Sequence, residues 1–254
     1  MILAVDIGNT NIVFGAFEGD TLRFTSRIST VRNRMEDEYA VTLLSVLHLN
    51  HLPEAEFDGA ILSSVVPELT PVLKRAIQKV ITGKVLIIGP GIKTGLDIKI
   101  DSPGGVGADL VCSAVYAKSV MPLPAIIIDM GTATKLTVLD KSGAFIGGAI
   151  VPGMKVSLDA LASSTAQLPA IGIEAPKTAI CNNTVDCMRS GSVFGSAAMV
   201  DGMIDRFCEE LGQQASVIIT GGHARHIVPL CRHQMIYNQD VMLLGLKIIY
   251  DKNN

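Results

Sequence analysis

The chain has 254 residues, of which 48% are hydrophobic, and its formal net charge is −3. This length allows a sizeable core and two domains or lobes. The small net charge, without any block of like charge, argues against a nucleic-acid surface or a membrane patch. It still permits a phosphate ligand, which backbone N–H groups and a metal ion can bind.

Localisation is predicted to be cytoplasmic. The chain enters a strand at once, without the basic region or the cleavage site of a signal peptide. No apolar run is long enough to span a bilayer. The five cysteines are odd in number and include no Cys-x-x-Cys pair, which indicates a reducing compartment.

The first predicted unit is a strand, a tight turn and a second strand over residues 2–17. Gly8 in the turn lets the main chain approach an anion closely, with N–H groups facing it. Thr10 and Asn11 add short hydrogen-bond donors. Asp6, at the end of a buried strand, suits magnesium held directly or through water. A third strand over 22–28 completes a β-meander.

Strands and helices alternate after this meander, which predicts a mainly α/β sheet. Asn33 and Glu36 have the spacing of a capping box before a helix that reaches about residue 47. A strand follows over 60–66, and Pro67 is placed to begin a helix that runs to about 81. Residues 84–88 form another buried strand.

An irregular loop over residues 92–107 is the least regular part of the first half and a candidate functional segment. It ends in Gly104, Gly105 and Gly107, and a helix then runs to about residue 120. Asp109 therefore lies in the first turn of a helix. Its carboxylate either stabilises the helix dipole or serves as a catalytic group, and the spacing alone leaves both interpretations open.

The opening pattern occurs a second time, after Pro122 and Pro124. A buried strand leads into Asp129-Met130-Gly131-Thr132-Ala133-Thr134, and a second apolar run follows. A single Asp-x-Gly turn is ordinary hairpin punctuation. Two copies, each between an apolar strand and a meander, favour two turns that grip the phosphates of a nucleotide.

The last third contains a glycine-rich segment over 147–153, a helix around 156–162, a loop over 167–183 and a long helix over 185–211. Small residues along this long helix indicate tight packing, which could be between subunits. A strand over 216–219 leads to Gly221 and Gly222, a natural wall for a nucleoside. A short strand over 235–237 and a helix over 240–250 follow.

The last third also contains several possible metal ligands close together in the sequence: His223, His226, Cys231 and His233. Their spacing matches no standard zinc pattern, and a solvated loop or helix is the better interpretation.

These motifs resemble the actin, sugar kinase and Hsp70 superfamily, and more closely the type III pantothenate kinases. The second resemblance runs nearly end to end and rests on seven segments: Asp6–Asn11, Ser64–Pro67, Gly105–Asp109, Asp129–Thr134, Gly147–Gly153, Asn183–Thr184 and Thr220–Gly222.

The resemblance implies two actin-like, ribonuclease H-like α/β lobes with duplicated β-meander cores and an ATP cleft between them. The expected lobes are residues 1–120 and 121–254, an arrangement in which the final helix can pack back on the first lobe. It also implies a homodimeric, ATP-dependent kinase that phosphorylates pantothenate, the first step toward coenzyme A, with magnesium and a monovalent cation (potassium or ammonium).

Residue roles are carried over by position. Asp6 belongs to the magnesium and phosphate site, and Asp129 to the monovalent cation. Asp109 would be the general base for the pantothenate hydroxyl, and Thr184 would reach the pantothenate of the neighbouring subunit. The phosphates and the nucleotide would be bordered by Gly8, Asn9, Thr10, Asn11, Gly131, Thr132, Gly221 and Gly222. The pantothenate would be bordered by Gly104, Gly105, Val106, Gly107, Ala108 and Asp109.

Three positions depart from the family pattern. Leu110 stands where the family usually has an Arg that helps to hold pantothenate, so a charge-assisted contact would be missing. Ser102 replaces a frequent aromatic residue, and Lys135 stands where a small or polar residue is commoner. Two alternatives therefore stay open: a kinase of the same fold for another small alcohol, and a catalytically weakened nucleotide-binding relative that acts as a regulatory or interaction protein.

Overall fold

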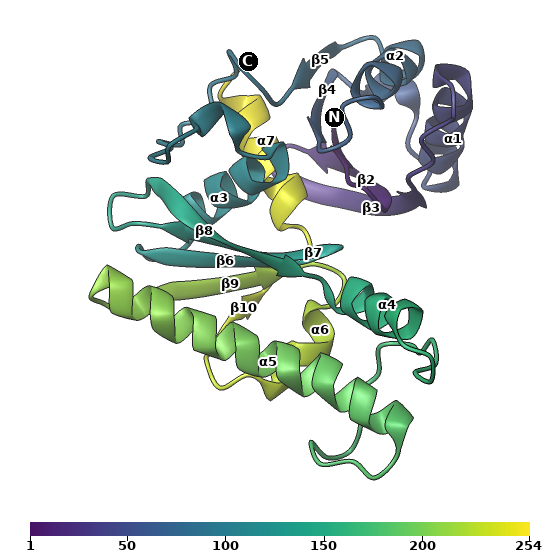
Figure 1. Ribbon diagram of the computed structural model, residues 1–254. Coiled ribbons are helices and arrows are strands. Elements are labelled where there is room, and N and C mark those ends of the chain that lie inside the picture. Colours follow the sequence, from purple (N-terminus) through teal and green to yellow (C-terminus); the bar gives the residue numbers. More distant parts are fainter. The chain divides into compact units, whose positions relative to one another are not determined.

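The computed structural model describes all residues from 1 to 254 and contains two five-stranded sheets (Figure 1). The chain divides into two compact units. The first comprises residues 1–96, 101–116 and 240–254, and the second comprises residues 97–100 and 117–239.

The sheet of the first unit has the strand order β3-β2-β1-β4-β5. Strands β1, β2 and β3 form an antiparallel meander, whereas β4 runs parallel to β1 and β5 parallel to β4. The strands are β1 (Ile2–Ile7), β2 (Asn11–Glu18), β3 (Thr21–Ser29), β4 (Gly59–Ser64) and β5 (Lys84–Ile87).

The sheet of the second unit repeats this order as β8-β7-β6-β9-β10, with the same strand directions. The predicted duplication of a β-meander core is confirmed. The strands are β6 (Ala125–Met130), β7 (Ala133–Leu139), β8 (Phe145–Pro152), β9 (Ser216–Thr220) and β10 (Ile236–Tyr237).

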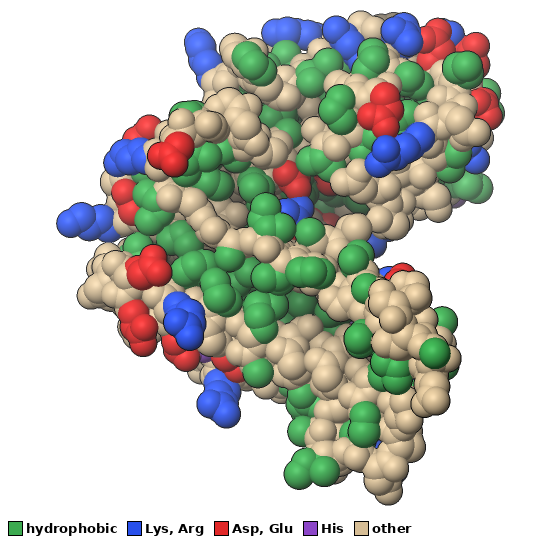
Figure 2. All heavy atoms as spheres, in the orientation of Figure 1, with side chains coloured by type: hydrophobic (Ala, Val, Ile, Leu, Met, Phe, Trp, Pro, Cys, Tyr) green, Lys and Arg blue, Asp and Glu red, His purple; other side chains and the backbone are tan.

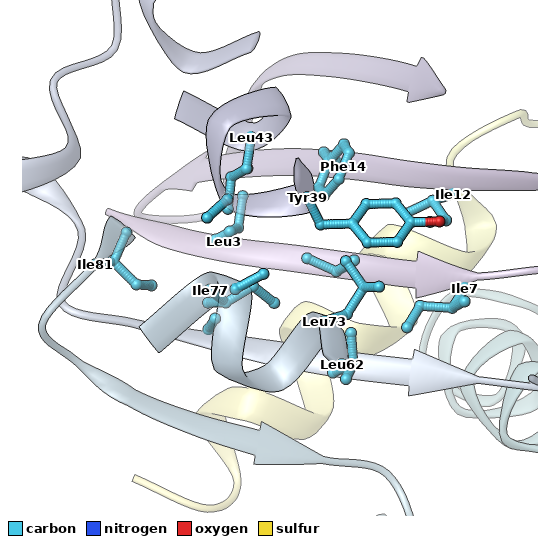
Figure 3. Packing of buried hydrophobic residues seen from close by; sticks show 14 of the residues in the cluster. Leu3, Ile7, Ile12, Phe14, Tyr39, Leu43, Leu62, Leu73, Ile77 and Ile81 are labelled. Carbon is cyan, nitrogen blue, oxygen red and sulfur yellow. The ribbon is translucent and has the colours of Figure 1, made fainter. Parts of the chain in front are cut away.

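Helices α1 (Glu36–Leu49) and α2 (Thr70–Val80) cover one face of the first sheet. Figure 3 shows side chains from β1, β2 and β4 meeting side chains of these two helices in one apolar layer. Tyr39 is 1% exposed, yet its hydroxyl is satisfied, because it donates to the Val31 carbonyl at 2.8 Å and accepts from the Val31 N–H at 3.1 Å.

Helix α7 (Val241–Asp251) packs on β1, β2 and β4 and on α3 (Ala108–Val120). Glycines permit these approaches: a Cβ at Gly15 would lie 2.7 Å from Leu243, and one at Gly245 would overlap the carbonyl oxygen of Cys112. The final helix thus belongs to the first unit and supports the helix that carries Asp109.

The core of the second unit lies between its sheet and helices α4 (Met154–Ser164), α5 (Thr184–Leu211) and α6 (Ala224–Ile227). Three short 3₁₀ helices complete the structure, at Glu54–Glu56, Pro103–Gly105 and Val228–Leu230.

No helix of the chain combines the length and the apolar character that crossing a bilayer requires. On the face drawn in Figure 2, acidic and basic side chains are interspersed rather than gathered by sign.

The predicted starts of two helices are wrong by two or three residues. Helix α1 begins at Glu36, and the N–H of Met35 donates to the Glu38 carboxylate at 2.8 Å. Glu36 is therefore not a capping residue, and it pairs with Arg75 and Lys79 of α2 instead. Helix α2 begins at Thr70, after a turn that contains Pro67.

Candidate active site

The first turn is closed by its own backbone and held by the residue that follows β3. The Gly8 N–H donates to the Asn11 carbonyl at 2.9 Å, and a Cβ at Gly8 would lie only 3.0 Å from that oxygen. Thr30 donates its hydroxyl to the Gly8 carbonyl at 2.7 Å and its N–H to the Thr10 carbonyl at 3.0 Å. The tip, Asn9 and Thr10, is exposed to solvent and open to a ligand.

A basic side chain that sequence reasoning missed lies against this turn. Arg32 donates to the Asn9 side-chain oxygen at 3.1 Å and pairs with Glu68 at 3.0 Å. No motif marks Arg32, because it follows β3 in an irregular segment and reaches the turn only once the meander has folded. Thr30 was missed for the same reason.

Asp6 and Asp109 lie on the same side of the first unit. Burial raises the pKa of the Cys112 thiol well above its usual value, and the charges of Asp6 and Asp109 raise it further. Both carboxylates therefore lie close enough to this wholly buried thiol to act on it. Asp6 itself stands beside Ser63 in the parallel register of β1 and β4.

The glycine-rich loop brings Asp109 to its place at the start of α3. A Cβ at Gly107 would lie 2.5 Å from the Asp109 carboxylate and 4.0 Å from Val65, just beyond β4. The Asp109 carboxylate accepts the N–H of Leu110 at 2.9 Å. Because β1 and β4 are parallel neighbours, the helix start lies near the carboxyl ends of both strands.

The rest of the predicted acceptor segment is open. Gly104 and Gly105 are exposed, and a Cβ at either would meet nothing within 4 Å. Ser102 is exposed as well, and Val106 and Ala108 are half-buried. Leu110 is half-buried, so its side chain is partly available to a ligand.

Two glycine segments enclose the second turn. The N–H of Gly131 donates to the Ala133 carbonyl at 3.2 Å, and that of Gly153 to the Thr132 carbonyl at 3.1 Å. A Cβ at Gly153 would lie 2.5 Å from the Gly131 carbonyl oxygen. Gly221 has a φ of +95°, and a Cβ there would lie 2.5 Å from the Met130 backbone. Gly221 is thus beside the second turn, and the nucleoside wall predicted at Gly221 and Gly222 stays a prediction.

Lys135 supplies the charge behind the second turn. Its ammonium lies 2.8 Å from the Asp129 carboxylate, and the two side chains are 19% and 22% exposed. Asp129 and Lys135 stand directly opposite each other in the antiparallel register of β6 and β7. The structure therefore puts a lysine at the carboxylate for which the resemblance predicts a monovalent cation.

Thr184 is the first residue of α5, a helix of 28 residues. Asn183 caps this helix by accepting the Asp186 N–H at 2.9 Å. Thr184 is exposed, so its hydroxyl can meet a group from outside the chain. A helix start also favours an anionic group such as a carboxylate.

The rings of His223 and His226 lie near each other, with centroids 6.4 Å apart. His233 lies 2.8 Å from Asp205. Burial lowers the pKa of His223 and of His226, and the neighbouring Arg225 lowers both further. No group of three or more His, Cys, Asp or Glu side chains suited to a metal ion forms within the chain itself.

Comparisons with known proteins agree with this geometry. A family model described as type III pantothenate kinase matches residues 2–206. Proteins named type III pantothenate kinase are similar over the full length of both chains: one from Exiguobacterium sibiricum is 43% identical over 253 residues, and one from Moorella thermoacetica is 40% identical over 255 residues.

Solved structures with lower identity show the fold alone. A ROK hexokinase from Thermus thermophilus superposes with a TM-score of 0.53 at 11% identity, with 100% of this chain and 99% of that chain covered. A Campylobacter jejuni protein, described as a candidate Baf family transcriptional activator, gives a TM-score of 0.60 at 18% identity, with coverage of 99% and 98%. Together with the two sheets, these similarities confirm the actin-like α/β fold with two lobes.

Proposed function

The chain belongs to the type III pantothenate kinase family, and we infer that it transfers the γ-phosphate of ATP to pantothenate in the first step of coenzyme A synthesis. The observation that carries this conclusion is the full-length similarity, together with two glycine turns at the ends of corresponding strands. Phosphoryl transfer depends mainly on positioning and on neutralising charge, which such turns supply.

The first turn is assigned to the ATP phosphates and magnesium. Gly8, Asn9, Thr10 and Asn11 offer backbone N–H groups and short side chains to phosphate oxygens. Asp6 would hold magnesium, directly or through water, and Asp109 adds a second carboxylate nearby. This donor set fits magnesium, which is usually bound through one or two carboxylates and the phosphates of the substrate. When bound, magnesium neutralises charge on the phosphates.

Asp109 is assigned as the general base. Its carboxylate accepts the proton of the pantothenate hydroxyl while the hydroxyl oxygen attacks the γ-phosphorus. The new O–P bond forms as the bond from the γ-phosphorus to the bridging oxygen breaks, and ADP leaves with that electron pair. The Gly104–Asp109 segment would lie along the acceptor, and its two open glycines, Gly104 and Gly105, support a close approach of the backbone.

The second turn is assigned to phosphate as well, through Gly131 and Thr132, with Gly221 and Gly222 beside the nucleoside. The predicted potassium or ammonium ion would bind at Asp129. Oxygen Oδ2 of this carboxylate already has the Lys135 ammonium at 2.8 Å. The residues present therefore do not fit a second cation on that oxygen.

The enzyme is assigned as a cytoplasmic homodimer, in which Thr184 contacts the pantothenate of the partner subunit. Helix α5 supports a dimer, since Gly191, Gly195 and Ala198 are exposed and no other part of the chain covers the two glycines. The cytoplasmic location is supported by five free cysteines, of which Cys187 is exposed.

Incubation with magnesium-ATP, potassium and pantothenate tests the activity directly. We expect mass spectrometry to detect 4′-phosphopantothenate and an equal amount of ADP. ATP binding without product would contradict pantothenate as the substrate. A panel of other small alcohols in the same assay would then test the alternative that Leu110 and Ser102 suggest, a kinase of this fold with a different acceptor.

A further inference from the structure

The carboxylate of the second turn is neutralised by the chain itself. Lys135 and Asp129 form an ion pair of 2.8 Å with only 19% and 22% of the side chains exposed. The β6–β7 register fixes the two residues opposite each other, so the pair needs no loop to close on it. A partly buried pair on a rigid sheet is screened much less by salt than an exposed one.

A positive charge is required at this place if the turn receives phosphate. The Asp129 carboxylate and a phosphate group are both anions and would repel each other at close range. The family resemblance assigns the compensating charge to a potassium or ammonium ion. A lysine side chain ends in a compact ammonium with three N–H donors, so it carries the same charge and can bridge a carboxylate and a phosphate oxygen.

The first sheet shows that the repeated fold does not itself demand a lysine here. The residue opposite Asp6 in β2, at the position that corresponds to Lys135, is Val13. Lys135 is therefore particular to the second turn.

We propose that Lys135 replaces the monovalent cation, so that this kinase works without potassium or ammonium. The inference rests on the proposed role of the second turn as a phosphate site. A tethered ammonium is present at every turnover, whereas a free cation must bind from solution. The positive charge is then supplied by the side chain of Lys135 and does not depend on the cations in solution.

The test begins with the wild-type enzyme in potassium-free and ammonium-free buffer, with ionic strength held by choline chloride. Without a cation site to fill, added potassium or ammonium should change turnover and ATP affinity by less than about twofold. The melting temperature in the presence of ADP should likewise be insensitive to potassium. A severalfold rise in turnover or in ATP affinity with potassium would overturn the proposal.

Lys135→Thr supplies the converse measurement. In potassium-free buffer its turnover should fall at least about tenfold, because a charge facing phosphate is lost. Potassium or ammonium should restore most of that loss and raise the melting temperature of this variant but not of the wild type. Lys155→Ala removes an exposed lysine of α4 that pairs with Asp159, and it should behave as the wild type in every salt.

The melting and ATP-binding measurements separate this inference from the proposed function. If the wild type phosphorylates no pantothenate in any salt, the substrate assignment fails, and the cation question is still decided by ATP affinity with and without potassium. If Lys135→Thr loses activity that potassium does not restore, the lysine does not stand in for the ion. If that variant does not fold, the wild-type titration decides alone.

Discussion

Asp6 and Asp129 occupy corresponding places in two sheets of the same strand order. Each lies on the first strand of its meander, beside a hydroxyl residue of the parallel neighbour: Ser63 for Asp6 and Thr220 for Asp129. The antiparallel neighbours differ, since Asp6 faces Val13 and Asp129 faces Lys135. The repeated backbone thus makes two similar glycine turns, and single side chains decide which charge stands behind each turn.

The charged neighbours of Asp6 and Asp129 also differ. Asp6 shares the neighbourhood of Cys112 with a second carboxylate, Asp109. Asp129 is paired with the ammonium of Lys135. The carboxylate of the first turn thus has a second acidic side chain nearby, and the carboxylate of the second turn has a basic one.

Asp109→Asn should give the largest effect on turnover, because it removes the proposed general base. The second unit is left unchanged. Turnover should fall about 10²–10⁴-fold, the usual contribution of a general base. ATP affinity, measured by calorimetry, should stay near that of the wild type. Asp101→Asn, in the same loop and exposed, is the matched control and should keep full turnover. Near-normal turnover in Asp109→Asn would remove Asp109 from this role.

Gly221→Ala tests the glycine pair that follows β9. The first sheet has no such pair, because Ser64 and Val65 stand at the corresponding end of β4. The substitution adds a Cβ at a φ of +95°, 2.5 Å from the Met130 backbone. Strain and overlap together should lower the free energy of unfolding by about 3 kcal/mol, measured by urea denaturation.

Gly212→Ala is the control for backbone strain alone. Gly212 also has a positive φ, +66°, but a Cβ there would meet nothing within 4 Å. Its replacement should cost about 1 kcal/mol. Equal losses in the two variants would show that the close approach of Gly221 to the second turn contributes nothing.

The local parts of the site could be predicted from the sequence, because each depends on a short segment. Asp6 to Asn11, Asp129 to Thr134 and the Gly221-Gly222 pair lie beside strands that apolar runs already mark. The Asp129–Lys135 pair could also have been predicted. The two residues are equally far along the sequence from Thr132, the centre of the turn, and so stand opposite each other in antiparallel strands.

Other parts of the site depend on contacts between distant segments. Arg32 reaches Asn9 only across the folded meander. Asp109 precedes Cys112 by three residues on α3, whereas Asp6 approaches Cys112 only in the folded unit, where α7 packs on both β1 and α3. The predicted capping box is wrong although Asn33 and Glu36 have the required spacing. The charges of Arg75 and Lys79 draw Glu36 toward α2 instead.

Leu110→Arg tests whether the proposed acceptor segment, Gly104–Asp109, lacks a positive charge for pantothenate. A guanidinium in the half-buried position next to Asp109 could form a charge-assisted contact with pantothenate. The KM for pantothenate should fall about tenfold, with the KM for ATP unchanged. An unchanged KM for pantothenate would show that position 110 does not face the substrate.

Thr184→Ala should give the smallest effect, because one neutral hydrogen bond to pantothenate would be lost. The KM for pantothenate should rise about fivefold at constant kcat. Thr178→Ala removes another exposed hydroxyl, in the loop before α5, and should leave both constants unchanged. Since the proposed contact crosses to the partner subunit, sedimentation should show a dimer at assay concentrations. A monomer with full activity would mean that Thr184 contacts no neighbouring site, and that the second unit contributes to catalysis only through its phosphate turn.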